Sequence, residues 1–526
     1  MKRAGRFLLN GLMLSAVSLL LRTVGVSFHA FLTAKMGAAG TGLYQLILSV
    51  YSPALTLATA GVNLAVSRLV AEELGKDGDG LARAVLRKCL GYAAVASALV
   101  GAILLLISET AATRWLDAPE AAPLLRVLAL GLPFIALSSA MNGYFTAVRR
   151  VSRTAFVQIL EQGVRIGLTV LLLGRLWDGG TASCLLAIIA ASVGADLFSC
   201  LFLTLLCRRD AAGIGKSSRR GQGEILPRIL AITLPVSFSS FLRSGLVAVE
   251  HLLIPRGLKQ SGASYETAMA SYGALTGMAM PIILFPASFL YAFAGLLIPE
   301  LAEAKENRRE GEIAATAERV VNTVLIYGIG AAGLLLGFSR DLGLAVYHSE
   351  EAALYIRVMA PLIPIMYLDT AVDSVLKGLG QQVYTMKVNI IDAFVSVLAV
   401  WLLVPRLGLK GYIVVIFISE LINFSFSFTR MVTVAGAKGI FFRRIPLPVL
   451  AAMGGVGLAK QIVRFLPASA APAMGAAMGM ALAAMGYVTL LLLFGVIPRR
   501  RVLSLVRSLR LSLPRRTVPR HESSNV

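Results

Sequence analysis

The chain has 526 residues, of which 57% are hydrophobic and only 15% are charged, and its formal net charge is +22. A soluble chain carries about 25% charged residues, so this composition excludes a series of soluble domains and favours a protein that faces lipid. The positive charge would suggest nucleic-acid binding in a soluble protein. Here the basic residues lie between apolar runs, so membrane topology explains them better and no nucleic-acid partner is expected.

Runs of about 20 apolar residues mark membrane-spanning helices. The first run follows Lys2 and Arg3 as in a signal peptide, but no cleavage site follows it, so we interpret it as a retained span. The sequence predicts an all-α integral membrane protein with about fourteen spans. They lie at 8–34, 43–71, 84–108, 122–148, 154–174, 182–207, 227–254, 270–298, 318–339, 353–377, 384–404, 411–432, 446–466 and 473–497.

Most of the Lys and Arg residues between the runs fall on the side of the N-terminus. Because cytoplasmic loops are enriched in these residues, we expect both termini in the cytoplasm. The C-terminal stretch 499–516 has Val and Leu on one helical face and Arg on much of the rest. This pattern predicts a helix that lies on the anionic inner leaflet.

The chain contains an internal repeat. A shift of 231 residues places Glu161 on Asp392, and other shifts place Arg22 on Arg243 and Asp196 on Glu420. Each half has six spans, so both halves enter from the same side, as in transporters with parallel repeats. The predicted domains are a first six-helix bundle (1–210), a cytoplasmic linker (211–226), a second six-helix bundle (227–440), helices 13 and 14 (441–498) and a basic cytoplasmic tail (499–526).

Two patterns that resemble cofactor or metal sites have simpler explanations. Gly328, Gly330 and Gly333 spell G-x-G-x-x-G inside the ninth span, where no strand precedes them, so close helix packing explains them. The cysteines lie in or at the end of apolar runs without metal-ligand spacing, which predicts small buried residues; they are Cys89, Cys184, Cys200 and Cys207. The sequence predicts no cofactor and no metal.

Ionisable side chains inside spans are costly and tend to face a cavity or a partner. Arg22 and Arg243 occupy matching positions in the first and seventh spans and could face one another across a central cavity. Guanidinium groups suit phosphate because they bind it bidentately and stay charged, although packing or contact with lipid phosphate would also explain them. Glu250 and His251 follow Arg243 by two turns, and a buried histidine with a hydrogen-bond partner is the simpler interpretation of His251.

Other intramembrane charges have partners on their own helix. Glu161 and Arg165 are four residues apart and can pair, as can Asp373 and Lys377. Asp392 has no oppositely charged residue one turn away, which makes it the strongest single candidate for a proton or cation site. We therefore predict Asp392, with Glu161 and Arg165, as the ion-coupling residues.

Several motifs resemble a known family. The stretch from Gly37 to Gln45, then Tyr51-Ser52-Pro53, and then the stretch from Ser67 to Glu72 are similar to the stage V sporulation protein B group. That group belongs to the polysaccharide-exporter branch of the multidrug/oligosaccharidyl-lipid/polysaccharide flippase superfamily. The resemblance covers the chain to about the fourteenth span.

The resemblance implies two six-helix bundles in a V shape, alternately open to each side of a bacterial plasma membrane. It implies a lipid-linked cell-wall or polysaccharide precursor as cargo, a role in sporulation, and contact with the cell-wall synthesis machinery. In related flippases arginines of the first helices line the cavity. Arg22, Arg68 and Arg243 are the positions that match, and we add Glu250 as a predicted substrate contact.

Three alternatives stay open. A cation-coupled drug exporter of the same superfamily would favour an acidic cavity, and the spans hold seven carboxylates against five arginines. A membrane enzyme would need catalytic residues in sizeable outer loops, but the longest, 259–267, has only Glu266 as an acid, so we expect no enzyme. A scaffold for cell-wall synthesis would tolerate the loss of Arg22 and Arg243 together.

Overall fold

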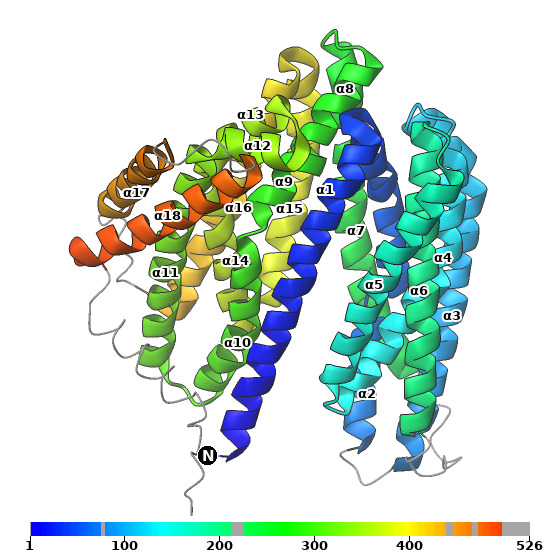
Figure 1. Ribbon diagram of the computed structural model, residues 1–526. Helices are drawn as coiled ribbons and strands as arrows, with labels where there is room; N and C mark the ends of the chain where they lie inside the picture. The colour runs from blue at the N-terminus through cyan, green and yellow to red at the C-terminus, as the bar shows by residue number, and fades with distance from the viewer. Residues whose placement is uncertain (1, 75–78, 212–224, 438–444, 465–471, 497–526) are drawn as a thin grey trace, which may run out of the picture.

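A computed structural model describes residues 2–74, 79–211, 225–437, 445–464 and 472–496 (Figure 1). These described residues form helices and contain no strand. Thirteen segments among them are long and apolar enough to cross a membrane. The first segment, Thr23–Leu74, contains parts of two predicted spans, so the thirteen segments account for all fourteen. The predicted all-α membrane fold is confirmed.

The described chain up to residue 260 contains eight helical elements, the last of which opens the predicted second bundle. They are α1 (Lys2–Thr59), α2 (Val62–Leu74), α3 (Asp79–Thr110), the π-helix η1 (Ala111–Trp115), α4 (Ala121–Ala147), α5 (Val151–Leu176), α6 (Thr181–Ala211) and α7 (Ile225–Gln260). The predicted linker 211–226 lies largely outside the described residues, and the predicted interfacial helix and tail, 499–526, lie entirely outside them.

The second half divides its spans into more pieces. Its elements are α8 (Tyr265–Tyr272), the π-helix η3 (Gly273–Ala279), α9 (Met280–Leu284), α10 (Ala287–Glu306), α11 (Glu310–Gly337), α12 (Ser339–Tyr347), α13 (Glu350–Met359), the 3-10 turn η4 (Ala360–Leu362), α14 (Ile363–Gly378), α15 (Gln382–Leu407), α16 (Leu409–Ala435), α17 (Pro446–Arg464) and α18 (Pro472–Leu493). Prolines stand at several of these breaks, since proline cannot donate the helical hydrogen bond.

Helix α1 has 58 residues, far more than the roughly 20 that cross a bilayer. It turns at Gly37, whose φ of 71° and ψ of 178° interrupt the helix. The first part rises from the N-terminus to the opposite face, and the second part returns (Figure 1). We call the face at which α1 begins the lower face and the opposite one, which carries α8, the upper face.

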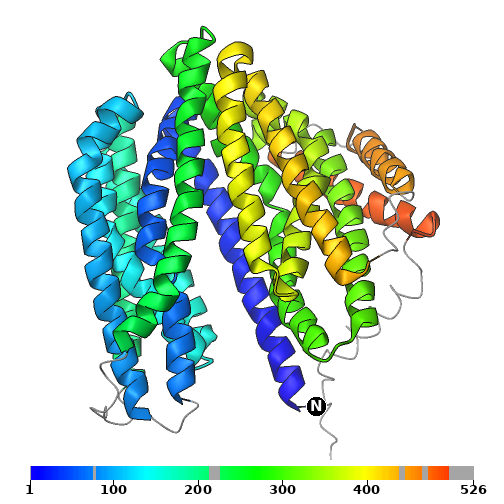
Figure 2. The same cartoon turned by 180° about the vertical axis from the view of Figure 1, so that it is seen from behind.

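The helices form two groups, best seen by comparing Figures 1 and 2. Helices α2 to α6 form the first bundle, and α8 to α16 form the second, with α17 and α18 beside α11. Helix α7 joins both, because its lower end is bonded to the first bundle and its upper part packs on α15. Arg228 of α7 forms ion pairs of 2.8 Å with both Glu72 and Glu73 of α2.

The two halves approach most closely toward the upper face. A Cβ atom on Gly42 of α1 would lie 2.2 Å from the carbonyl oxygen of Met269, and one on Gly273 would lie 2.1 Å from that of Ala38. No other residue fits at such a crossing, since only a missing side chain lets two membrane helices approach this closely.

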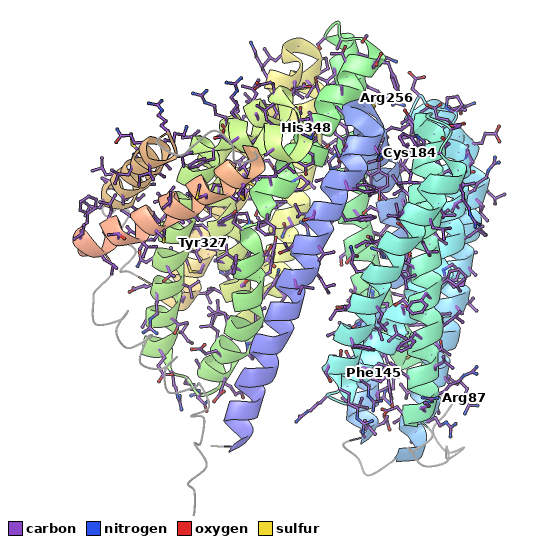
Figure 3. The ribbon with its side chains drawn as sticks, in the orientation of Figure 1. Arg87, Phe145, Cys184, Arg256, Tyr327 and His348 are labelled. Atoms are coloured by element: carbon purple, nitrogen blue, oxygen red, sulfur yellow. The ribbon has the colours of Figure 1, made fainter. Side chains whose placement is uncertain are left out.

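Polar contacts close the same face. Lys259 Nζ of α7 lies 2.6 Å from Asp117 Oδ2, in the segment between η1 and α4. The guanidinium of Arg256, labelled at the upper face in Figure 3, donates to the backbone carbonyl oxygens of Arg114 and Trp115. Helix α7 is therefore tied to the first bundle at both of its ends.

The G-x-G-x-x-G pattern is a packing surface, as predicted. Gly328, Gly330 and Gly333 of α11 lie against residues of α14, α18 and α17, respectively. The four cysteines are buried and unbonded, which confirms their predicted role as core residues.

Candidate functional site

The first bundle contains an ion-pair cluster between α5 and α6. Arg165 Nη2 donates to Glu161 Oε1 at 2.7 Å, which confirms the pair expected from their four-residue spacing. The same atom donates to Asp196 Oδ1 of α6 at 3.1 Å. One guanidinium thus pairs with two carboxylates, and all three side chains are largely buried. The three groups together carry one net negative charge when all of them are ionised.

A polar pocket of ≈ 250 Å³ lies beside this cluster. Glu161 and Asp196 line it together with Asn63 of α2 and Asn142 of α4, and Asn63 Nδ2 donates to the carbonyl oxygen of Ser139 at 3.1 Å. Amides and carboxylates at membrane depth belong to water-filled or solute-filled space, because lipid cannot satisfy them. The pocket therefore marks a hydrated region within the first bundle.

The second bundle places Asp392 against α16. Ser419 Oγ donates to Asp392 Oδ1 at 2.5 Å, and Asn423 Nδ2 lies 3.5 Å from Asp392 Oδ2. Asp392 has no charged partner on its own helix, α15. Uncharged hydrogen-bond donors on the neighbouring helix α16 contact it instead.

More acids gather around Asp392. Glu250 of α7 lies near Ser396 and interacts electrostatically with Asp392. Asp369 and Asp392 both interact electrostatically with Arg243. The cluster has five carboxylates and two cations; these are Glu250, Asp369, Asp373, Asp392 and Glu420, with Arg243 and Lys377. The predicted pair of Asp373 and Lys377 is confirmed at 3.3 Å.

The repeat relates the two clusters. Glu161 and Asp196 of the first cluster correspond to Asp392 and Glu420 of the second, on matching helices. The residue that matches Arg165 is Ser396, so the second cluster lacks an arginine on α15. Its excess of carboxylates is the main chemical difference between the bundles.

The predicted substrate arginines lie at different depths. Arg68 lies toward the lower end of α2, is 64% exposed and pairs with Glu72 at 2.9 Å. Arg243 is exposed on α7, and it follows Arg228, which binds the same Glu72, by fifteen residues, or about 22 Å of helix. Arg22 belongs to α1, but its side chain lies outside the described part of the structure, so its proximity to Arg243 stays a prediction.

His251 does have a buried partner, as the simpler interpretation predicted. Its Nδ1 lies 2.7 Å from the hydroxyl of Tyr272. Glu250, the neighbouring predicted substrate contact, lies instead among the acids of the second bundle.

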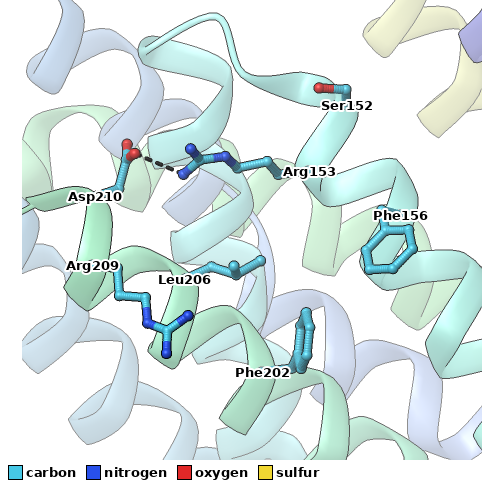
Figure 4. Close-up of a pocket in the computed structure, with 7 residues that line it drawn as sticks. All are labelled: Ser152, Arg153, Phe156, Phe202, Leu206, Arg209 and Asp210. Carbon is cyan, nitrogen blue, oxygen red and sulfur yellow. Dashed lines mark hydrogen bonds and ion pairs between the residues drawn. The ribbon is translucent and has the colours of Figure 1, made fainter.

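A further buried acid, Asp210 at the end of α6, has no local sequence pattern that reveals it. Its side chain is 7% exposed and accepts hydrogen bonds from Arg150, Arg153 and Tyr144. Arg153 Nη1 lies 2.7 Å from Asp210 Oδ1, the contact drawn in Figure 4. These partners are 57 to 66 residues away in sequence, so no local spacing reveals them.

Metal chemistry has little support in the described ranges. Within them, no group of three or more His, Cys, Asp or Glu side chains is arranged to hold a metal ion. The acids of the second bundle instead combine with hydroxyl and amide groups.

Comparison with known proteins identifies relatives for most of the chain. The model of a family described as polysaccharide biosynthesis protein matches residues 7–305. Stage V sporulation protein B of Bacillus subtilis (strain 168) is 26% identical over 412 residues, which cover 77% of this chain and 79% of that protein. Lipid II flippase MurJ of the same strain is 22% identical over 475 residues, covering 85% and 86%.

Solved structures have the same fold. A lipid II flippase MurJ in an inward closed conformation matches with a TM-score of 0.65 and 11% identity, covering 92% of this chain and 99% of that one. An inward-facing multidrug resistance transporter of the MATE family matches with a TM-score of 0.61 and 15% identity, covering 81% and 100%. Both likenesses agree with an all-α membrane transporter fold.

Proposed function

Because the chain belongs to the polysaccharide biosynthesis protein family, we propose that it is a flippase that moves a lipid-linked sugar precursor across the bacterial plasma membrane. The observation that carries this proposal is the closed upper face. There the two halves meet through Gly42 and Gly273 and through the pair of Lys259 and Asp117. With both termini in the cytoplasm, as we propose, the closed upper face would be the outer one.

The cargo would be a polyprenyl-diphosphate-linked sugar, such as a peptidoglycan, spore cortex or polysaccharide precursor. One relative is named a lipid II flippase and another a sporulation protein. Such a substrate needs cations for its diphosphate, and the exposed side chains of Arg68 and Arg243 would supply them at two depths. Arg22 would complete the set, since guanidinium binds phosphate bidentately.

Energy would come from an ion that binds the acids of the second bundle. Five carboxylates near two cations cannot all stay ionised at membrane depth without further positive charge. A proton or a monovalent cation bound at Asp392 would supply this positive charge. Release of that ion would change the interaction between Asp392 and Arg243. The first cluster, in which Arg165 pairs with carboxylates of both helices, would hold α5 and α6 together.

A cation-coupled drug exporter is the second candidate. The same surplus of carboxylates favours it, because an acidic cavity binds cationic compounds. The structural match to a MATE family transporter fits either function. A non-transporting scaffold has no specific observation in its favour, and the transporter relatives support a protein that is not an enzyme.

Flipping of a fluorescent polyprenyl-diphosphate sugar in liposomes tests the proposal. Protection of the label from an external quencher would be followed under an imposed membrane potential. We expect flipping by the wild type and about a hundredfold slower flipping by the double variant Arg22→Ala, Arg243→Ala, because two charge-assisted contacts are lost. Arg340→Gln, which removes an exposed upper-face arginine paired with Glu350, is the matched control and should flip normally.

The alternatives give different results in this assay. A double variant as fast as the wild type would exclude the phosphate role of these arginines. If neither protein moves the lipid while both fold and bind a cationic dye, the exporter is the better description.

A further inference from the structure

A groove of ≈ 580 Å³ lies at the lower end of the first bundle, outside the transport site. It runs between α3, α4 and α6. Its rim carries three arginines and its floor is apolar; these residues are Arg83, Arg87 and Arg208 on the rim, with Leu86, Met141 and Cys207 on the floor. Figure 3 shows Arg87 at this lower end of the bundle.

The charge of the rim is not compensated within the described residues. No acidic side chain lines the groove, and in the described ranges none of the three arginines forms an ion pair with an acid. A second pocket at this end of the bundle, lined by Arg153, Phe202 and Asp210, differs because Arg153 is paired there with Asp210 (Figure 4). Arg83 and Arg87 are one helical turn apart, where like charges repel, so an anion between them would be stabilising.

The surroundings of the groove face lipid. Leu201 and Leu205 lie on the same side of α6 as Arg208, at intervals of four and three residues, and both leucines are largely exposed. An exposed leucine stripe that ends in an arginine is typical of a helix crossing from acyl chains to headgroups. The groove therefore joins a cationic rim to an apolar floor at the level of the headgroups.

The groove is also remote from the proposed cargo path. Helix α3 lies at the edge of the first bundle that is farthest from the second bundle, in both Figure 1 and Figure 2. We propose that this groove binds the headgroup of an anionic phospholipid from the leaflet at the lower face. The phosphate lies between the three arginines, and an acyl chain covers Leu86 and Met141.

Native mass spectrometry of the full chain in detergent tests this site, with phosphatidylglycerol as the probe and phosphatidylcholine as the uncharged comparison. The variant is Arg83→Gln, Arg87→Gln, Arg208→Gln. Its affinity for phosphatidylglycerol should fall about a hundredfold, since each basic residue contributes about fivefold. The control is Arg308→Gln, Arg309→Gln, Lys387→Gln, which removes three exposed charges outside the groove and should bind as the wild type does.

Three results would overturn the proposal. They are equal binding of phosphatidylglycerol by the variant and the wild type, an equal loss in the control, and equal binding of both lipids by the wild type. Competition by inorganic phosphate at millimolar concentration would reassign the site to a soluble anion. Unchanged helical circular dichroism of the variant in phosphatidylcholine micelles ensures that a loss of binding is not a loss of folding.

Discussion

Arg165 is the cation that both Glu161 and Asp196 contact, so a single side chain decides the charge balance of the first cluster. In the second cluster that position is Ser396, and Arg243 reaches the acids from α7. From this difference we propose that the first cluster is structural and that the second changes its protonation or ion occupancy during transport.

Arg165→Met should destabilise the protein by about 2 kcal/mol, because it leaves two largely buried carboxylates without their cation. The free energy of unfolding in mixed micelles measures this. The triple variant Glu161→Gln, Arg165→Met, Asp196→Asn has no charge left to compensate and should recover most of the loss. A single variant as stable as the wild type would show that the cluster is neutral or solvated in another way.

Asp117 gives the upper face a dependence on pH. The Lys259 ammonium holds the pKa of the Asp117 carboxyl below its usual range. The pKa of Asp117 is lower in the folded state than in the unfolded state. The ion pair therefore stabilises the fold fully at a pH above the unfolded pKa of about 3.9, and this stabilisation is lost as the pH falls through the folded pKa. The difference in melting temperature between the wild type and Asp117→Asn should therefore shrink below about pH 4.

Asparagine is the suitable replacement because Asp117 has a φ of 55°, a conformation that asparagine also tolerates. A difference that stays constant from pH 6 to pH 3 would mean that the ion pair makes no contribution to stability.

Helix α1 depends on one glycine for its change of direction. Gly37 has a φ of 71°, and nothing lies within 4 Å of a Cβ atom placed there. Gly37→Ala should cost about 2 kcal/mol from backbone strain alone, because a positive φ with a ψ near 180° is a conformation that essentially only glycine adopts. Gly25→Ala is the matched control in the same helix, with equal space and an ordinary φ, and should be neutral or slightly stabilising. Equal effects of the two substitutions on thermal unfolding would contradict this account of the turn.

For the molecule as a whole, apolar length and repeat symmetry predicted the spans well, because both are local properties of the sequence. The pairs Glu161–Arg165 and Asp373–Lys377 were predictable for the same reason, since four residues make one helical turn. The contacts of Asp392 with α16, and those of Asp210 with α4 and α5, could not be predicted from the sequence. They depend on how the helices pack against one another. The substrate roles of Arg22, Arg68, Arg243 and Glu250, the ion-coupling roles of Asp392, Glu161 and Arg165, and the domain boundaries stay predictions.

If the two halves alternate, the upper face that is closed in this conformation must open during transport. A short reversible thiol cross-linker that joins Asp117→Cys to Lys259→Cys would hold this face closed, and flipping of the lipid-linked sugar would then be measured. We expect cross-linking to stop flipping and reduction to restore it. The same cross-link between Arg340→Cys and Glu350→Cys, within the second half, should have no effect. Undiminished flipping by the protein cross-linked at positions 117 and 259 would contradict alternating access through this face.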